Sequence, residues 1–180
     1  MPAYFHPERE AAGWARLGPA EVVVVNPATG PGTGDPAYRA AIPALSGLVA
    51  GYVDTAYARR PVAEVLADVE AHRRLHGVEA VFLDRVTSGR EHLDHYAALA
   101  EHLPRPLLLN PGVRPDPGYL ALADVVVTFE GDWAAHEALT GPDPAGVTWH
   151  LVHGVRTEAQ PGVLRRAAAL GACLGYATEP

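Results

Sequence analysis

Eight short apolar runs recur along this sequence, and stretches with the spacing of amphipathic helices separate them. Several runs are almost continuous in Val, Leu, Ile and Phe, which is typical of strands buried on both faces of a parallel sheet. The predicted strands are Ala3–His6, Val22–Asn26, Leu48–Val53, Ala80–Asp84, Leu107–Asn110, Val125–Glu130, Thr148–His153 and Ala172–Tyr176. The predicted helices are Glu8–Leu17, Ala37–Leu45, Val62–His76, Glu91–Leu103, Asp116–Leu122, Trp133–Leu139 and Ala159–Leu170.

This alternation indicates βαβ units with right-handed crossovers. Eight strands and seven helices favour a compact (β/α)8 barrel of the TIM type, closed into a ring and lacking the helix that usually follows the eighth strand. We expect a single domain over residues 1–180. Because such barrels usually have roughly 200 to 250 residues or more, an open, doubly wound sheet is the alternative fold.

The composition is that of an ordinary globular chain with an acidic balance. Hydrophobic residues make up 48%, charged residues 19%, and the formal net charge is −7. An acidic chain repels phosphate backbones, so a nucleic-acid partner is not expected, whereas a cationic sugar or amine would be tolerated. The sequence shows no signal peptide and no apolar run near the ~20 residues of a membrane helix. We therefore expect a cytoplasmic protein with no membrane contact. The one cysteine, Cys173, lies among apolar residues and is expected to be a buried, inert thiol.

Polar side chains follow the apolar runs at nearly every predicted strand end. They are His6, Asn26, Asp54 or Thr55, Asp84, Asn110, Glu130, His153, and Tyr176 or Thr178. In a barrel these ends open into the mouth where catalytic residues gather. Side chains alternate along a strand, so Ala80, Phe82 and Asp84 are expected on one face, as are Val126, Thr128 and Glu130. The simpler interpretation is that polar residues merely favour strand ends.

Two of these residues are carboxylates beside buried apolar groups. Asp84 follows Val-Phe-Leu and Glu130 follows Val-Thr-Phe. Burying an ionised carboxylate is costly unless it is paired or used. Two such groups are the minimal equipment for cleaving a glycosidic bond, one as general acid and the other as nucleophile or base. The sequence does not say which residue takes which role.

Neither a cofactor nor a metal ion is expected. The glycine-rich stretch 26–34 follows a strand but lacks the Lys-Ser/Thr ending of a phosphate-binding loop and the spacing of a dinucleotide site. The chain has no cysteine cluster and no HExxH motif. His6 and His153, at strand ends, are the better pocket candidates among the histidines. Five aromatic residues could stack on a sugar ring, although each could equally be core packing: Tyr4, Tyr52, Tyr57, Trp133 and Trp149.

Several motifs occur in an order that resembles the spherulin-4 family, also called spherulation-specific family 4. They are Pro2-Ala3-Tyr4-Phe5-His6-Pro7 with Trp14, Asn26-Pro27 with Gly30-Pro31-Gly32, Gly51-Tyr52-Val53-Asp54-Thr55-Ala56-Tyr57, Val81-Phe82-Leu83-Asp84, Leu109-Asn110-Pro111-Gly112 and Phe129-Glu130. The resemblance implies a barrel related to glycoside hydrolases that cleave α-1,4-linked galactosamine or N-acetylgalactosamine polymers. It also implies acidic residues at the ends of the fourth and sixth strands, which Asp84 and Glu130 match. The family usually has Glu after the first of these, whereas this chain has Arg85.

The leading hypothesis is therefore a glycoside-hydrolase-like enzyme. Asp84 and Glu130 would be catalytic, and the substrate-binding candidates are His6, Asn26, Tyr52, Asp54, Arg85, Asn110, His153 and Tyr176. Arg85 could lower the pKa of a nearby carboxylate or bind an anionic group. Two alternatives remain open, because a barrel supports many chemistries. One is a lyase, isomerase or cyclase that acts on a small metabolite, and the other is a binding protein without catalysis. A homo-oligomer contact could cover the edge that the missing last helix leaves exposed.

Overall fold

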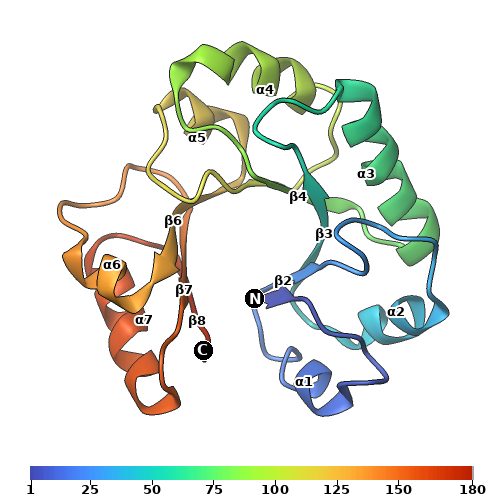
Figure 1. Ribbon diagram of the computed structural model, residues 1–180, viewed down its shortest axis with the longest axis horizontal. Coiled ribbons are helices and arrows are strands. Elements are labelled where there is room, and N and C mark those ends of the chain that lie inside the picture. The colour runs from blue at the N-terminus through green and yellow to red at the C-terminus, as the bar shows by residue number, and fades with distance from the viewer. Residues whose placement is uncertain (180) are drawn as a thin grey trace.

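Each predicted apolar run contributes a strand. The computed structural model describes residues 1–179. Its strands are β1 (Pro2–Ala3), β2 (Val22–Val25), β3 (Leu48–Asp54), β4 (Ala80–Asp84), β5 (Leu107–Leu109), β6 (Val125–Asp132), β7 (Thr148–His153) and β8 (Leu174–Ala177). They form one sheet in the order β1-β2-β3-β4-β5-β6-β7-β8, and all neighbouring strands are parallel. The sheet curves into a barrel with the helices on its outside (Figure 1).

The sequential strand order decides between the two predicted folds. A doubly wound sheet reverses its strand order at a switch point between neighbouring strands. This sheet never reverses, so the TIM-type barrel prediction is confirmed and the doubly wound alternative is wrong.

The expectation of a closed ring was wrong. Within residues 1–179 no ladder joins β8 to β1, and the N-terminus and β8 lie on either side of the resulting seam (Figure 1). The first strand has only two residues, one of them Pro2, which lacks the N–H that a ladder needs. The last strand has four residues and contains Gly175, and a glycine weakens a strand. No helix follows β8 in residues 178–179.

All seven predicted helices are present; α3 has the predicted bounds, and the other six are shorter than predicted. They are α1 (Ala11–Ala15), α2 (Pro36–Ala41), α3 (Val62–His76), α4 (Leu93–Ala100), α5 (Gly118–Leu122), α6 (Trp133–Ala138) and α7 (Gln160–Ala169). Three 3₁₀ turns, η1 (Ile42–Ala44), η2 (Arg90–His92) and η3 (Thr157–Ala159), take up part of the predicted lengths. Local chemistry sets the ends of individual helices: the Asp35 side chain accepts from the N–H of Ala37 at the start of α2, and α3 ends at Gly77 with φ +70°.

Alternation along the strands divides the apolar residues between two layers. The barrel interior contains Val22, Val24, Ala50, Tyr52, Ala80, Phe82, Leu108, Val125, Val127, Trp149 and Leu151. The other strand side chains pack against the helices, for example Leu83 and Leu107 against Tyr96 and Leu99 of α4. At the C-terminal end of each strand, the next inward position after the interior residues opens into the mouth of the barrel.

A buried polar cluster holds the segment before β7 against the outside of the barrel. The carboxylate of Asp143 is fully buried and accepts from Arg114 Nε at 3.0 Å and Thr128 Oγ1 at 2.7 Å, and it pairs with His150 Nε2 at 3.0 Å. Burial acts to raise the pKa of Asp143, but the hydrogen bonds outweigh it and hold that pKa well below its usual value. His150 also meets His136 at 2.9 Å. Burial lowers the pKa of His136 to about 4.

Cys173 departs from its prediction. Its side chain is exposed rather than buried, because the residue precedes β8 in the turn after α7 instead of lying within the strand. Within residues 1–179, no helix is both long and apolar enough to span a bilayer.

Candidate active site

Asp84 ends β4 and points into the mouth of the barrel, as alternation from Ala80 and Phe82 predicts. Its carboxylate accepts two hydrogen bonds, from Tyr52 Oη at 2.8 Å and from Asn110 Nδ2 at 2.7 Å. Neighbouring strands supply these donors, since Tyr52 lies on β3 and Asn110 directly follows β5. Two neutral donors on separate oxygens suit an ionised carboxylate.

Tyr52 is itself held from outside the barrel. The buried His72 of α3 lies with Nε2 2.8 Å from the Tyr52 carbonyl, so Nε2 carries the proton and donates. Burial lowers the pKa of His72 to about 4, which keeps the ring neutral near pH 7. The helix approaches this closely because residue 51 is glycine: a Cβ there would lie 2.5 Å from the His72 ring. These contacts hold the β3 backbone on which the Tyr52 side chain is carried.

Glu130 reaches the mouth through a β-bulge that the sequence analysis missed. We expected Val126, Thr128 and Glu130 on one face, and this is wrong. The register between β6 and β7 shifts between Val127 and Phe129, so Thr128 is an extra residue. Its hydroxyl points outward to the buried Asp143 cluster. Beyond the bulge the alternation is reversed, and Glu130 faces inward.

Asn110 joins the two carboxylates. Its Nδ2 donates to Asp84 Oδ1 at 2.7 Å and to Glu130 Oε2 at 2.6 Å. The Asn110 side chain is almost fully buried, whereas Glu130 keeps access to solvent. The pKa of Glu130 is raised, chiefly because the walls of the mouth remove water from the carboxyl. The hydrogen bond from Asn110 opposes this shift, and the negative charge of Asp84 adds to it.

Two cavities flank this carboxylate pair, and Glu130 lines both. The first has a volume of about 290 Å³ and lies toward the seam; it is lined by Pro2, Tyr4, Phe5, Glu130, Leu151, Val152, His153, Tyr176 and Thr178. The second has a volume of about 340 Å³ and is lined by Tyr57, Asp84, Arg85, Asn110, Pro111, Gly112, Val113 and Glu130. We call them the seam cavity and the Arg85 cavity.

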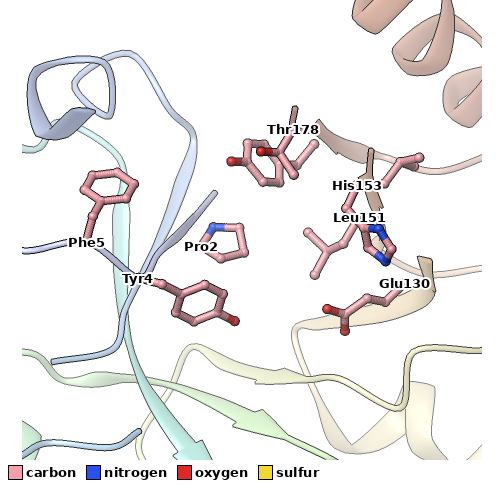
Figure 2. Close-up of a pocket in the computed structure, with 9 residues that line it drawn as sticks. Pro2, Tyr4, Phe5, Glu130, Leu151, His153 and Thr178 are labelled. Carbon is pink, nitrogen blue, oxygen red and sulfur yellow. The ribbon is translucent and has the colours of Figure 1, made fainter. Parts of the chain in front are cut away.

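Figure 2 shows the seam cavity, with the Tyr4 hydroxyl and the Glu130 carboxylate pointing into the same space and His153 beside Glu130. Tyr4 is 59% exposed and lies edge-on to Tyr52. Loss of hydration, together with the charges of Asp84 and Glu130, raises the pKa of Tyr4. The Tyr4 hydroxyl therefore stays protonated at neutral pH and is available to donate a hydrogen bond.

The structure does not bring every predicted site residue to these cavities. Asp84, Asn110, Glu130, His153, Tyr176 and Arg85 line one or both, and Tyr52 contacts Asp84 directly. His6 lies beyond the short β1, where Nδ1 accepts from the turn and Nε2 meets Asp35 at 2.8 Å. The side chain of Asn26 accepts from the N–H of Gly30 in its own loop. The carboxylate of Asp54 pairs with Arg85 at 3.3 Å.

Of the five aromatic candidates, Tyr4 and Tyr57 line cavities, and Tyr52 holds Asp84. Trp149 fills the barrel interior, and Trp133 stacks on His136 outside the barrel. The sequence analysis missed the apolar lining residue Leu151. Its position two residues before His153 on β7 is the signal that could have identified it.

Comparison with known proteins supports the sequence resemblance. The family model described as "Spherulation-specific family 4" matches residues 1–171. Spherulin-4 of Physarum polycephalum is 29% identical over 147 residues, which cover 72% of this chain but only 43% of that protein. This chain thus corresponds to less than half the length of that relative.

Two solved structures share the fold. The crystal structure of Aspergillus clavatus Sph3 in complex with GalNAc aligns with a TM-score of 0.78 at 24% identity, covering 99% of this chain and 85% of that one. A mandelate racemase/muconate lactonizing enzyme-like protein from Rubrobacter xylanophilus aligns with a TM-score of 0.53 at 17% identity, covering 97% of this chain and 50% of that one. On the family match over nearly its whole length, the chain belongs to spherulation-specific family 4.

Proposed function

We propose that this protein is a retaining glycoside hydrolase that cleaves polymers of α-1,4-linked galactosamine or N-acetylgalactosamine, with Asp84 as nucleophile and Glu130 as general acid and base. The observation that carries the proposal is the pair of carboxylates at the barrel mouth, both bonded to one amide nitrogen. The family match supports the reaction class, and the GalNAc complex of the structurally similar Sph3 supports the sugar.

The separation of the carboxylates favours retention of configuration. Asp84 Oδ1 and Glu130 Oε2 both lie within 2.7 Å of Asn110 Nδ2, so these two oxygens can be no farther apart than two such hydrogen bonds end to end. That limit matches the roughly 5–5.5 Å between the carboxyl groups of retaining glycosidases. Inverting enzymes need roughly 6.5–9.5 Å, because a water molecule must fit between one carboxylate and the sugar.

The environments of the two groups assign their roles. Asp84, whose two oxygens accept from Tyr52 and Asn110, is oriented by these donors and is suited to attack the anomeric carbon. Glu130, whose pKa is raised, is suited to hold a proton and give it to the departing glycosidic oxygen. In the second step Glu130 takes a proton from water, the water oxygen attacks the anomeric carbon, and the bond to Asp84 breaks. The products are two shorter sugars, and both carboxyl groups return to their starting states.

The cavities provide places for sugar on both sides of Glu130. In the seam cavity, Tyr4, Tyr176 and Phe5 offer aromatic surface, and the Tyr4 hydroxyl and His153 offer polar contacts. A sugar ring presents apolar C–H faces and hydroxyl edges, so aromatic walls with a few polar groups fit it.

The first experiment is to incubate the protein with α-1,4-linked galactosamine and N-acetylgalactosamine oligomers and to follow shortened products by mass spectrometry. We expect cleavage by the wild type and losses of about 10³-fold or more in Asp84→Asn and Glu130→Gln. The anomer formed first, read by proton NMR, should be the same as that of the substrate.

Azide separates the two roles. For an Asp84→Ala variant, azide should restore turnover and give a glycosyl azide of inverted configuration, because it attacks in place of the missing nucleophile. For Glu130→Ala with an activated leaving group, the azide product should retain the configuration, because Asp84 still forms the covalent intermediate. No product from any oligomer with a folded wild type would overturn the proposal and favour the small-metabolite or binding-protein alternatives.

A further inference from the structure

The conformation of Arg85 is unusual and specific. The residue directly follows β4 and has φ +53°, in the left-handed region that is strained for a non-glycine residue. Strained backbone of this kind persists where the surroundings enforce it, and it concentrates at functional sites. Here it turns a side chain that alternation would direct to the helices into the cavity beside Asp84.

The loop after β3 enforces this conformation. Three consecutive residues of that loop, Ala56, Tyr57 and Ala58, also have positive φ, at 47°, 57° and 63°. The N–H of Tyr57 donates to the Arg85 carbonyl at 2.8 Å. The buried Thr55 hydroxyl lies 2.8 Å from the same carbonyl and 2.8 Å from the hydroxyl of Tyr96. Arg85 is therefore held by a second strained loop and not only by its own.

The guanidinium group of Arg85 has one carboxylate partner and lies over one aromatic ring. Nε lies 3.3 Å from Asp54 Oδ1, and the group sits 5.3 Å from the centre of the Tyr57 ring. Nη1 and Nη2 donate no hydrogen bond to any residue in 1–179, and the side chain is 42% exposed. An arginine that is fixed at Nε and on one ring face presents its remaining N–H fork in a defined direction, which suits bidentate binding of an oxyanion.

We propose that Arg85 and Tyr57 form an anion-binding subsite for a sugar that carries a carboxylate or sulfate group next to the bond that is cleaved. The inference rests on the proposed function for the identity of the ligand as a sugar. Arg85 makes no ion pair with Asp84 or Glu130 within the described chain. Nε pairs with Asp54, and the Nη1 and Nη2 groups remain for whatever occupies the Arg85 cavity. The Tyr57 ring, 49% exposed, adds a surface on which that sugar can lie.

The subsite also discriminates against the opposite charge. A cationic sugar placed in the Arg85 cavity would meet a permanent cation, whereas a neutral one would meet an unused N–H fork. We therefore expect galactosamine units, which carry an ammonium group, to be accepted less readily at this position than acetylated or anionic units.

Binding of small sugars tests the subsite without any need for turnover. Calorimetry or NMR titration would compare N-acetylgalactosamine with its 4-sulfate and 6-sulfate, and galactose with galacturonic acid. We expect at least one anionic sugar to bind the wild type about tenfold more tightly than its neutral partner, because charge-assisted hydrogen bonds of an arginine are worth about that factor. The difference should shrink as salt is added. The sulfate and carboxylate arms show which anion is taken.

Arg85→Gln should abolish the preference while neutral sugars still bind, and Arg85→Lys should keep part of it. The matched control is Arg59→Gln, which removes a cation on the same Tyr57 ring, 5.9 Å from its centre, but outside the cavity lining. It should leave the preference intact. The subsite would be overturned if the wild type bound anionic and neutral sugars equally, or if it bound no anionic sugar. It would also be overturned if Arg85→Gln and Arg59→Gln lost the anion preference to the same extent. Cleavage of neutral oligomers without a preference for anionic sugars would support the proposed hydrolase and overturn the subsite. A preference for anionic sugars without cleavage of any oligomer would support the subsite and overturn the hydrolase.

Discussion

Removing the amide that links the two carboxylates should change how Glu130 titrates. Asn110→Ala deletes the Nδ2 donor that lies 2.6 Å from Glu130 Oε2 and 2.7 Å from Asp84 Oδ1. That hydrogen bond favours the ionised form of Glu130, and its loss leaves two negative groups close together without a shared donor. Both effects disfavour ionisation of Glu130, so its pKa should rise further.

The size of this shift follows from the geometry and the exposure. A hydrogen bond to a charged group is worth about 1.5–3 kcal/mol, which corresponds to about one to two pKa units. Glu130 retains solvent access, so water replaces part of the lost bond. We therefore expect a rise of about one unit.

Carbon-13 NMR of protein labelled at the Glu carboxyl carbon would follow the Glu130 titration directly. The matched control is Tyr52→Phe, which removes a donor from Asp84 alone and should leave the Glu130 midpoint nearly where it is in the wild type. An unchanged or lower Glu130 midpoint in Asn110→Ala would refute the bridging role, as would an equal shift in both variants.

Two further predictions concern the buried polar cluster outside the barrel. Asp143→Ala leaves buried partners of the lost carboxylate without their acceptor. It should cost about 3–5 kcal/mol of unfolding free energy and lower Tm by about 10 °C. The control Glu70→Gln, at an exposed ion pair, should cost less than about 1 kcal/mol, and similar urea midpoints for the two variants would contradict the reasoning. The pKa of His136 is about 4 in the folded protein against 6.5 as the ordinary value, so the unfolded chain binds the extra proton and stability falls as pH drops from about 6.5 toward 4. Between pH 7.5 and 5 the unfolding free energy of the wild type should fall by about 2 kcal/mol more than that of His136→Gln. An identical pH dependence in both proteins would show that His136 does not contribute.

The fold was predictable because its signal is repeated. Eight apolar runs and seven helical patterns all point to the same βαβ unit, and the strand bounds at Ala80–Asp84 and Thr148–His153 agree with the prediction residue for residue. The open seam was less predictable, since it depends on whether two short strands at opposite ends of the chain meet. The one sequence feature that indicates a weakly paired β1 is the short apolar run around Pro2, whose nitrogen cannot donate a hydrogen bond to a neighbouring strand.

The site was predictable where strict alternation holds and unpredictable where the backbone departs from it. Asp84 follows two inward residues on a regular strand, so its direction could be read from the sequence. Glu130 was chosen for its position after an apolar run, but its assumed face relationship to Thr128 was wrong because a β-bulge intervenes. No glycine or proline marks Thr128 as an extra residue. The bulge is tied to the Asp143 hydrogen bond, a contact 15 residues away in the chain.

Arg85 shows why a departure from the family pattern at this position need not remove the chemistry. The sequence analysis left two roles open for it, to lower the pKa of a nearby carboxylate or to bind an anion. The pKa of Glu130 is raised rather than lowered, and Arg85 is not among its causes. The charge of Arg85 is paired with Asp54, while Asp84 is satisfied by the neutral groups of Tyr52 and Asn110. The arginine therefore lies beside the carboxylate pair without neutralising it, and its position favours a role in selecting the sugar over a role in cleaving the bond.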